Sequence, residues 1–368
     1  MIARTVLAVL ALAAGTTAAH AQRRPADAEA DPARVVALLA ALAHDSMEGR
    51  DTGSRGSAAA ARLIAAELER AGLQPAGDSG FFQRVPLAWQ TAQVQGRDGQ
   101  TRTVRRLVVL PDVAARDTVS AENRVATQAV NVVGVIRGSD PALREEAVVL
   151  TAHYDHIGTT AGGRCAAIGA DSVCNGADDD ASGTVAVIEM ARLLARQRPA
   201  PRRTVVVVLV TGEERGLLGT RWYIDHPVVP LERTAANLNM EMIGRPDSLA
   251  GGAGKGWLTG FDRSTMGRML REAGVPLVPD PRPEQNFFMR SDNIAFARRG
   301  IPAHTISSYN LHTDYHRAGD EARLADPAHM AAVITASAHA ARVLADGPLP
   351  AWAPGDSLGT IPRGGRRP

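Results

Sequence analysis

Two runs of apolar, largely β-branched residues each end in ionisable side chains: residues 147–156 read AVVLTAHYDH and residues 204–214 read TVVVVLVTGEE. Near-continuous runs of Val and Leu are typical of strands that are buried on both faces, as in parallel sheets covered by helices. Both runs are therefore expected to be central strands of one sheet.

The segment between the two runs has a different periodicity. Apolar residues recur at helical spacing over 183–197, which predicts a strand, helix, strand unit. Residues 235–240 and 303–307 are further strand candidates, and a helix-like stretch at 294–299 precedes the second of them. The sequence therefore predicts an α/β fold of three layers, α/β/α, around a mixed, largely parallel sheet whose ligands bind beyond the carboxyl ends of the strands.

The flanking segments are predicted from capping and turn signals. Residues 31–42 and 57–72 have the caps and apolar stripes of two helices. Residues 87–130 contain short β-like pieces and charged turns, which predicts an elaborated hairpin region too brief to be a domain. Pro, Gly and Arg dominate residues 346–368, which predicts a disordered tail. Residues 22–345 are thus expected to form a single domain.

The composition is that of an ordinary globular protein. Among 368 residues there are 41 Lys and Arg against 39 Asp and Glu, so the formal charge is only +2 and gives no indication of a nucleic-acid partner. The hydrophobic share of 45% and the charged share of 22% argue against disorder, collagen and coiled coil.

The amino terminus has the pattern of an export signal. A basic residue, an apolar run and small residues ending at Ala21 predict that residues 1–21 are a cleaved signal peptide and that the protein is periplasmic or extracellular. The apolar run is too short for a stable membrane anchor. In an oxidising compartment Cys165 and Cys174 are expected to form a disulfide.

Histidine and carboxylate side chains gather just past the predicted strands. His153 and Asp155 follow the first run on the same side of the strand, where Asp155 could accept one ring N–H of His153 and leave the other nitrogen for a metal. The three aspartates at 178–180 would repel one another unless cations compensate. Glu213 and Glu214 follow the second run and could divide metal binding and proton transfer between them.

Two further clusters extend this pattern. Glu241 is a lone carboxylate in an apolar frame, an arrangement that is costly without a partner. His312 and His316, with Asp320, follow the last predicted strand. Nitrogen and oxygen ligands without thiolates suit zinc, and the number of carboxylates suggests two ions bridged by one of them.

In order and spacing these clusters resemble peptidase family M28, the co-catalytic di-zinc aminopeptidases, over about residues 44–323. Residues 42–50 look like the family's N-terminal helix and turn, and residues 291–302 like its late pocket segment. The resemblance implies a zinc-peptidase (phosphorylase/hydrolase-like) fold, two zinc ions per chain and peptide substrates from which N-terminal residues are removed.

The resemblance also implies a role for each site residue. Asp179 would bridge the two ions, with a cis peptide bond to Asp180, and Glu213 would be the general base that takes a proton from the water between the ions. Tyr315 would donate to the oxyanion. The implied metal ligands are His153, Asp179, Glu214, Glu241 and His316.

Two features depart from the family pattern. Glu241 stands where the family usually has Asp, and its extra methylene is expected to permit coordination but to alter the metal spacing or preference. The segment before residue 130 is too short for the protease-associated domain that many relatives carry.

The residues leave alternatives open. The same ligands would serve a carboxypeptidase or another amidase, because they set the hydrolysis and not which end of the peptide enters. A metal-free binding protein could also use the fold. Phe287, Phe288, Met289 and Ile294 are expected in the core rather than in a pocket, and Arg290 could meet a substrate carboxylate. The oligomeric state is not indicated.

Overall fold

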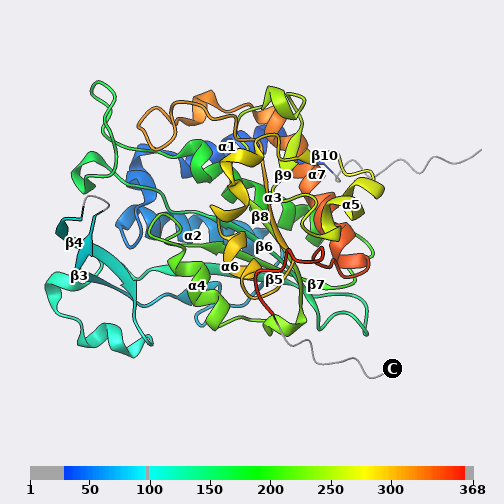
Figure 1. Ribbon diagram of the computed structural model, residues 1–368, viewed down its shortest axis with the longest axis horizontal. Helices are drawn as coiled ribbons and strands as arrows, with labels where there is room; N and C mark the ends of the chain where they lie inside the picture. The colour runs from blue at the N-terminus through cyan, green and yellow to red at the C-terminus, as the bar shows by residue number, and fades with distance from the viewer. Residues whose placement is uncertain (1–28, 97–98, 361–368) are drawn as a thin grey trace, which may run out of the picture.

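Four parallel strands form the centre of the protein, whose computed structural model describes residues 29–96 and 99–360 (Figure 1). They are β6 (Ala147–His153), β7 (Thr204–Val210), β8 (Thr234–Met240) and β11 (Ala303–Ser307), in the order β7-β6-β8-β11. All four predicted strands are present, and their shared direction brings their carboxyl ends to one edge of the sheet.

Further strands extend the sheet on both sides. On the β7 side β5 (Val130–Ile136) runs antiparallel to β7 and carries β1 (Gln74–Pro75) and β2 (Phe82–Arg84). On the β11 side β9 (Gly256–Leu258) is antiparallel to β11, and β10 (Leu277–Pro279) is parallel to β9. The sheet is therefore mixed and largely parallel, as the sequence predicted.

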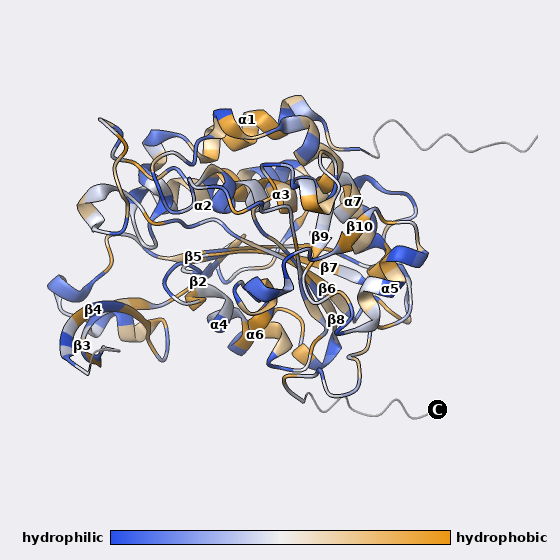
Figure 2. Ribbon diagram, turned by 45° about the horizontal axis from the view of Figure 1, so that its top comes forward, coloured by the Kyte–Doolittle hydropathy of each residue, from blue (hydrophilic) through white to orange (hydrophobic). Residues whose placement is uncertain are grey.

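Helices cover both faces of the sheet (Figure 2). One face carries α1 (Pro32–Leu42), α2 (Arg55–Arg70), α3 (Gly183–Arg196) and α7 (Pro327–Asp346). The opposite face carries α4 (Leu218–Asp225) and α6 (Asn293–Ala297), while α5 (Thr265–Glu272) packs beside α7 and β10. The prediction of three layers is confirmed. One-turn 3₁₀ helices connect these elements at Asp45–Arg50, Ala114–Thr118, Ala121–Asn123, Thr160–Gly162, Leu231–Arg233, Ser248–Ala250, Pro283–Gln285, Phe287–Met289 and Ala322–Leu324.

Alternation along β6 and β7 explains why these two strands are largely apolar. Leu150 and Val207 point into the core beneath α3, whereas Val149 and Val208 point into the second core on the opposite face. Because successive side chains face opposite sides, a strand between two helical layers is apolar on both faces except where a buried polar side chain has hydrogen-bond partners, as Asn239 of β8 does.

Two predictions at the edges of the fold need correction. The second helix begins at Arg55 with Ser54 as its cap, not at Ser57, because the Ser54 side chain accepts a hydrogen bond from the main-chain N–H of Ser57. The segment beyond 346, predicted to be disordered, is ordered against the body as far as residue 360. Trp352 there donates to the carbonyl of Gly300 at 3.0 Å.

Other predicted features take a definite form. Residues 87–130 contain a two-stranded antiparallel hairpin, β3 (Leu87–Gln95) with β4 (Thr101–Val109), which projects from one end of the molecule (Figure 1). Cys165 and Cys174 form the predicted disulfide. Within 29–96 and 99–360, no helix has both the length and the apolar character needed to cross a bilayer. The predicted signal peptide, residues 1–21, lies outside the described residues.

Candidate metal centre

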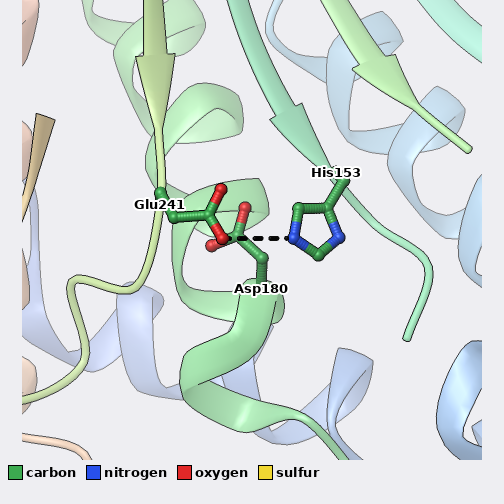
Figure 3. Close-up of side chains that lie close together, drawn as sticks. All are labelled: His153, Asp180 and Glu241. Carbon is green, nitrogen blue, oxygen red and sulfur yellow. Dashed lines mark hydrogen bonds and ion pairs between the residues drawn. The ribbon is translucent and has the colours of Figure 1, made fainter. Parts of the chain in front are cut away.

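The carboxyl ends of the parallel strands bring the predicted site residues together. His153 is the last residue of β6, Glu241 follows β8, and Glu213 and Glu214 follow β7. Figure 3 shows His153 and Glu241 converging from neighbouring strands, with Asp180 between them. Residues that are up to 88 positions apart in the chain thus share one edge of the sheet.

The loop before α3 supplies the aspartates. Asp320 accepts hydrogen bonds from the main-chain N–H groups of Asp178 and Asp179, at 3.0 Å in each case, and this holds the loop against the segment that carries His316. The peptide bond between Asp179 and Asp180 is cis, as expected. Asp178 accepts from the ring of His312 at 2.9 Å, so this histidine supports the loop.

Asp179 lies between two groups of donor atoms. Its Oδ1 is 3.4 Å from Nε2 of His153, and its Oδ2 is 3.1 Å from Nε2 of His316. On one side Glu241 Oε1 is 3.4 Å from the same nitrogen of His153. On the other side Glu214 Oε1 is 3.1 Å from Nε2 of His316. The Asp179 carboxylate therefore lies between two separate sets of donors, each made of one imidazole and one further carboxylate.

The second ring nitrogen of His153 has a partner other than the one predicted. Its Nδ1 lies 3.0 Å from the main-chain carbonyl of Asp155, whereas the carboxylate of Asp155 is 3.8 Å away. That carboxylate instead accepts from Thr52 Oγ1 at 2.9 Å and from the main-chain N–H of Glu213 at 3.1 Å. Asp155 thus fixes the position of the Glu213 loop, and its carbonyl, not its side chain, orients His153.

The charges in this cluster depend on one another. Burial alone would lower the pKa of His153, but Glu241 and Asp179 outweigh burial and raise that pKa well above its usual range. Burial of Asp179 is outweighed by the neighbouring imidazoles, led by His156, which hold the pKa of Asp179 well below its usual range. Burial raises the pKa of Glu213 well above its usual value, although His153 opposes the shift.

The donor atoms of the centre fit a divalent cation. Among the described residues, both ring nitrogens of His156, Oε1 of Glu214 and Oδ2 of Asp180 are buried without a hydrogen-bond partner. Buried polar atoms are costly when they are unpaired. Ligand atoms lie within 4.8 Å of one another in two sets, namely His153, Asp180 and Glu241, and His156, Asp179 and Glu214. Imidazole and carboxylate donors without thiolates match the preference of zinc.

A small cavity opens beside the centre. The cavity is lined by Glu241 of the metal centre and by aromatic side chains that include Tyr315, Trp257 and Phe287. The ring of Tyr315 stacks on His316 with 3.9 Å between centroids. Phe287 is buried in a separate hydrophobic cluster with Trp257 and Tyr309, as expected, and also lines the cavity. Phe288 and Ile294 belong to the second core, and Met289 packs against it.

Three functional features of the centre were not found in the sequence. His156 and Asp180 belong to the donor sets, although only their neighbours in the same motifs were assigned ligand roles. The buried side chain of Arg50 donates to the carbonyls of Leu42, Tyr154, Asn175 and Gly176 and so ties the N-terminal helix to the site loops. The position of His156 three residues after His153 was the available signal for that residue.

Comparison with known proteins adds independent findings. The model of peptidase family M28 matches residues 131–341. A probable zinc metalloprotease of Leptosphaeria maculans is 36% identical over 114 residues, which are 31% of this chain and 24% of that protein. Aminopeptidase YwaD of Bacillus subtilis is 30% identical over 115 residues, 31% of this chain and 22% of that protein. The chain therefore spans about a quarter of the length of these curated relatives.

A solved structure extends the likeness to most of the chain. The aminopeptidase from Aneurinibacillus sp. strain AM-1 superposes with a TM-score of 0.59 and covers 88% of this chain and 95% of that one. Its sequence identity is 15%, so the likeness concerns the fold.

Proposed function

This chain belongs to peptidase family M28, and from that premise we propose that it is an exported di-zinc metallopeptidase that removes N-terminal residues from peptides. The proposal rests mainly on the position of Asp179, because its two carboxylate oxygens face His153 and His316. A bridging carboxylate of this kind is the arrangement in which two ions act on one substrate. The bound zinc ions would polarise the scissile carbonyl and acidify a water molecule.

The roles of the protein side chains follow from their positions. Glu213, held through its main-chain N–H by Asp155, accepts a proton from the attacking water and passes it to the leaving amine. Burial raises the pKa of Tyr315, so its phenol stays protonated and donates to the oxyanion that develops on the carbonyl. His153, Glu214, Glu241 and His316 would hold the ions together with Asp179.

The cavity beside Glu241 would receive the side chain of the first substrate residue. Its aromatic walls bury apolar area, and the partly exposed carboxylate of Glu241 favours a positively charged amino terminus. Both properties support a substrate with a free amino terminus.

A second candidate, a carboxypeptidase or another amidase, is favoured by one observation. Arg290 lines the same cavity, and its guanidinium lies 5.2 Å from the ring centroid of Phe287. An exposed arginine near a hydrolytic centre would suit a substrate carboxylate. The two candidates differ in which end of a peptide enters the site.

The decisive experiment uses the protein without residues 1–21. Zinc content is measured, and the hydrolysis of aminoacyl p-nitroanilides is compared with that of N-acetylated peptides that have a free carboxyl terminus, each with and without a chelator. We expect two zinc equivalents and chelator-sensitive release from the free-amino substrates alone. Cleavage of the N-acetylated peptides at their carboxyl end would replace the aminopeptidase proposal with the second candidate.

A further inference from the structure

His156 differs from other buried histidines of the protein. Its side chain is fully buried, and neither ring nitrogen has an aligned hydrogen-bond partner among the described residues. His304, which is equally buried, has Ser264 Oγ at one ring nitrogen and the Thr259 carbonyl at the other. A buried polar group without a partner is destabilising, so a ligand of His156 is expected.

The surroundings of His156 supply the other donors of a metal site. Nδ1 lies 3.0 Å from Glu214 Oε1 and 3.8 Å from Asp179 Oδ2. His316 Nε2 lies 3.1 Å from each of the same two oxygens, and the rings of His156 and His316 meet edge to face with 5.6 Å between centroids. Both histidines therefore lie close to the same two carboxylate oxygens, and the donor atoms of His156, Asp179 and Glu214 are all within 4.8 Å of one another.

The alignment of these atoms favours a shared cation over a direct hydrogen bond. His156 Nδ1 and Glu214 Oε1 are close, yet each is without an aligned hydrogen-bond partner. Atoms that bind one ion at about 2.0–2.2 Å point at the ion and lie near one another without pointing at one another.

We propose that His156 is a fourth protein ligand of the metal position formed by Asp179, Glu214 and His316, binding through Nδ1. The inference rests on the proposed metal centre and makes it asymmetric. This position would then have two imidazole and two carboxylate donors, one protein ligand more than the position formed by His153, Asp179 and Glu241, and would hold its zinc ion more tightly. The position at His153 and Glu241 keeps room for water and substrate and is the one from which metal exchanges first.

The backbone around His156 holds its ring in place. Gly176 has a φ of +52°, and a Cβ there would lie 2.5 Å from Cγ and Cδ2 of the ring, so only glycine lets the main chain approach this closely. The main-chain N–H of His156 donates to the carbonyl of Arg50 at 3.3 Å. A ring that is fixed before the ion arrives loses little entropy on binding.

The test measures metal binding directly. Metal-free protein, wild type and His156→Gln, is loaded with one equivalent of zinc, the affinity is measured by competition with a chromophoric chelator, and the imidazole ligands are counted by zinc-edge X-ray absorption. We expect two imidazoles per zinc in the wild type and one in the variant, with an affinity at least about tenfold lower. The control is His304→Gln, which also removes a buried imidazole and is expected to keep both wild-type values.

Each outcome decides the proposal. An unchanged imidazole count in His156→Gln overturns it, even if the affinity falls, because the residue would then only position Glu214. A failed peptidase assay together with the expected imidazole counts would reject the proposed function and leave this ligand in place. If the wild-type protein hydrolyses peptides but the number of imidazoles per zinc is unchanged in His156→Gln, the proposed function stands and only His156 as a ligand is rejected.

Discussion

Asp179 combines two tasks in one side chain. Its carboxylate oxygens face different histidines, and its main-chain N–H is held by Asp320 at 3.0 Å. The pKa of Asp179 is held well below its usual range because the neighbouring imidazoles outweigh its burial. The residue therefore stays ionised under all conditions in which the centre would operate.

Replacing Glu213, the proposed general base, should separate chemistry from metal binding. Glu213→Gln keeps the volume and the main-chain hydrogen bond to Asp155, so zinc content should stay at the wild-type level while kcat falls by about 10²–10⁴-fold. Atomic absorption and steady-state kinetics check both parts. The neighbouring variant Glu214→Gln is the contrast, because it should lose metal. An active Glu213→Gln enzyme would show that another group is the base.

His304 predicts how stability depends on pH. Burial lowers the pKa of His304 to about 4, whereas the unfolded side chain titrates near its ordinary value of 6.5. Between these values the unfolded chain binds a proton that the folded chain does not, so the free energy of unfolding falls as pH decreases, by about 3 kcal/mol in total. Urea titrations of the metal-free protein between pH 7 and 4 measure this fall. The variant His304→Gln should show a smaller fall, and an identical one would contradict the prediction.

At the level of elements, the site forms where strand ends and loops converge. Other segments of the chain hold these loops in position. Arg164, directly before the disulfide-bonded Cys165, lies against Glu214, with 3.2 Å between guanidinium and carboxylate. Arg50 connects the 3₁₀ turn after α1 to the end of β6 and to the aspartate loop. These contacts fix the donors before any ion binds.

Arg50 should be irreplaceable even by lysine. Its guanidinium donates to four buried main-chain carbonyls, and a lysine ammonium cannot reproduce this planar set of donors. We expect Arg50→Lys to lower the free energy of unfolding by about 3 kcal/mol or more, measured by urea denaturation. Arg55→Lys is the matched control at an arginine whose side chain is 81% exposed, and it should change stability by less than about 0.5 kcal/mol. Equal effects at the two positions would contradict the assignment.

At the scale of the whole molecule, the donors come from both ends of the family-matched region. His153 lies on β6, whereas His316 follows β11 near the last helix, α7. Ions that join these segments bind the folded chain and have no preformed site in the unfolded one.

Metal removal should therefore lower the stability of the entire protein. Zinc at 100 times its Kd would add about 2.7 kcal/mol to the free energy of unfolding, which corresponds to several degrees in Tm. Calorimetry with and without a chelator measures the difference, and re-addition of zinc should restore the original Tm. If neither the chelator nor the re-added zinc changes the Tm, the metal does not stabilise the fold by joining these segments.

The sequence alone determined the central strands, the layer order and the motifs that supply the centre. Runs such as 204–210 are apolar throughout because both faces are covered, and this local pattern is visible without a structure. Parallel strands have their carboxyl ends at one edge, so His153, Glu214 and Glu241 could be expected to meet. The resemblance to a known family then gave each residue a proposed role.

Only the tertiary structure decided which atoms face one another. The carbonyl of Asp155 takes the place predicted for its carboxylate, His156 turns its ring toward Glu214, and Trp352 orders a tail whose composition predicted disorder. Arg50 became buried against carbonyls up to 126 positions away. Such contacts depend on side-chain direction and on packing between distant segments, and neither is encoded in local periodicity or composition.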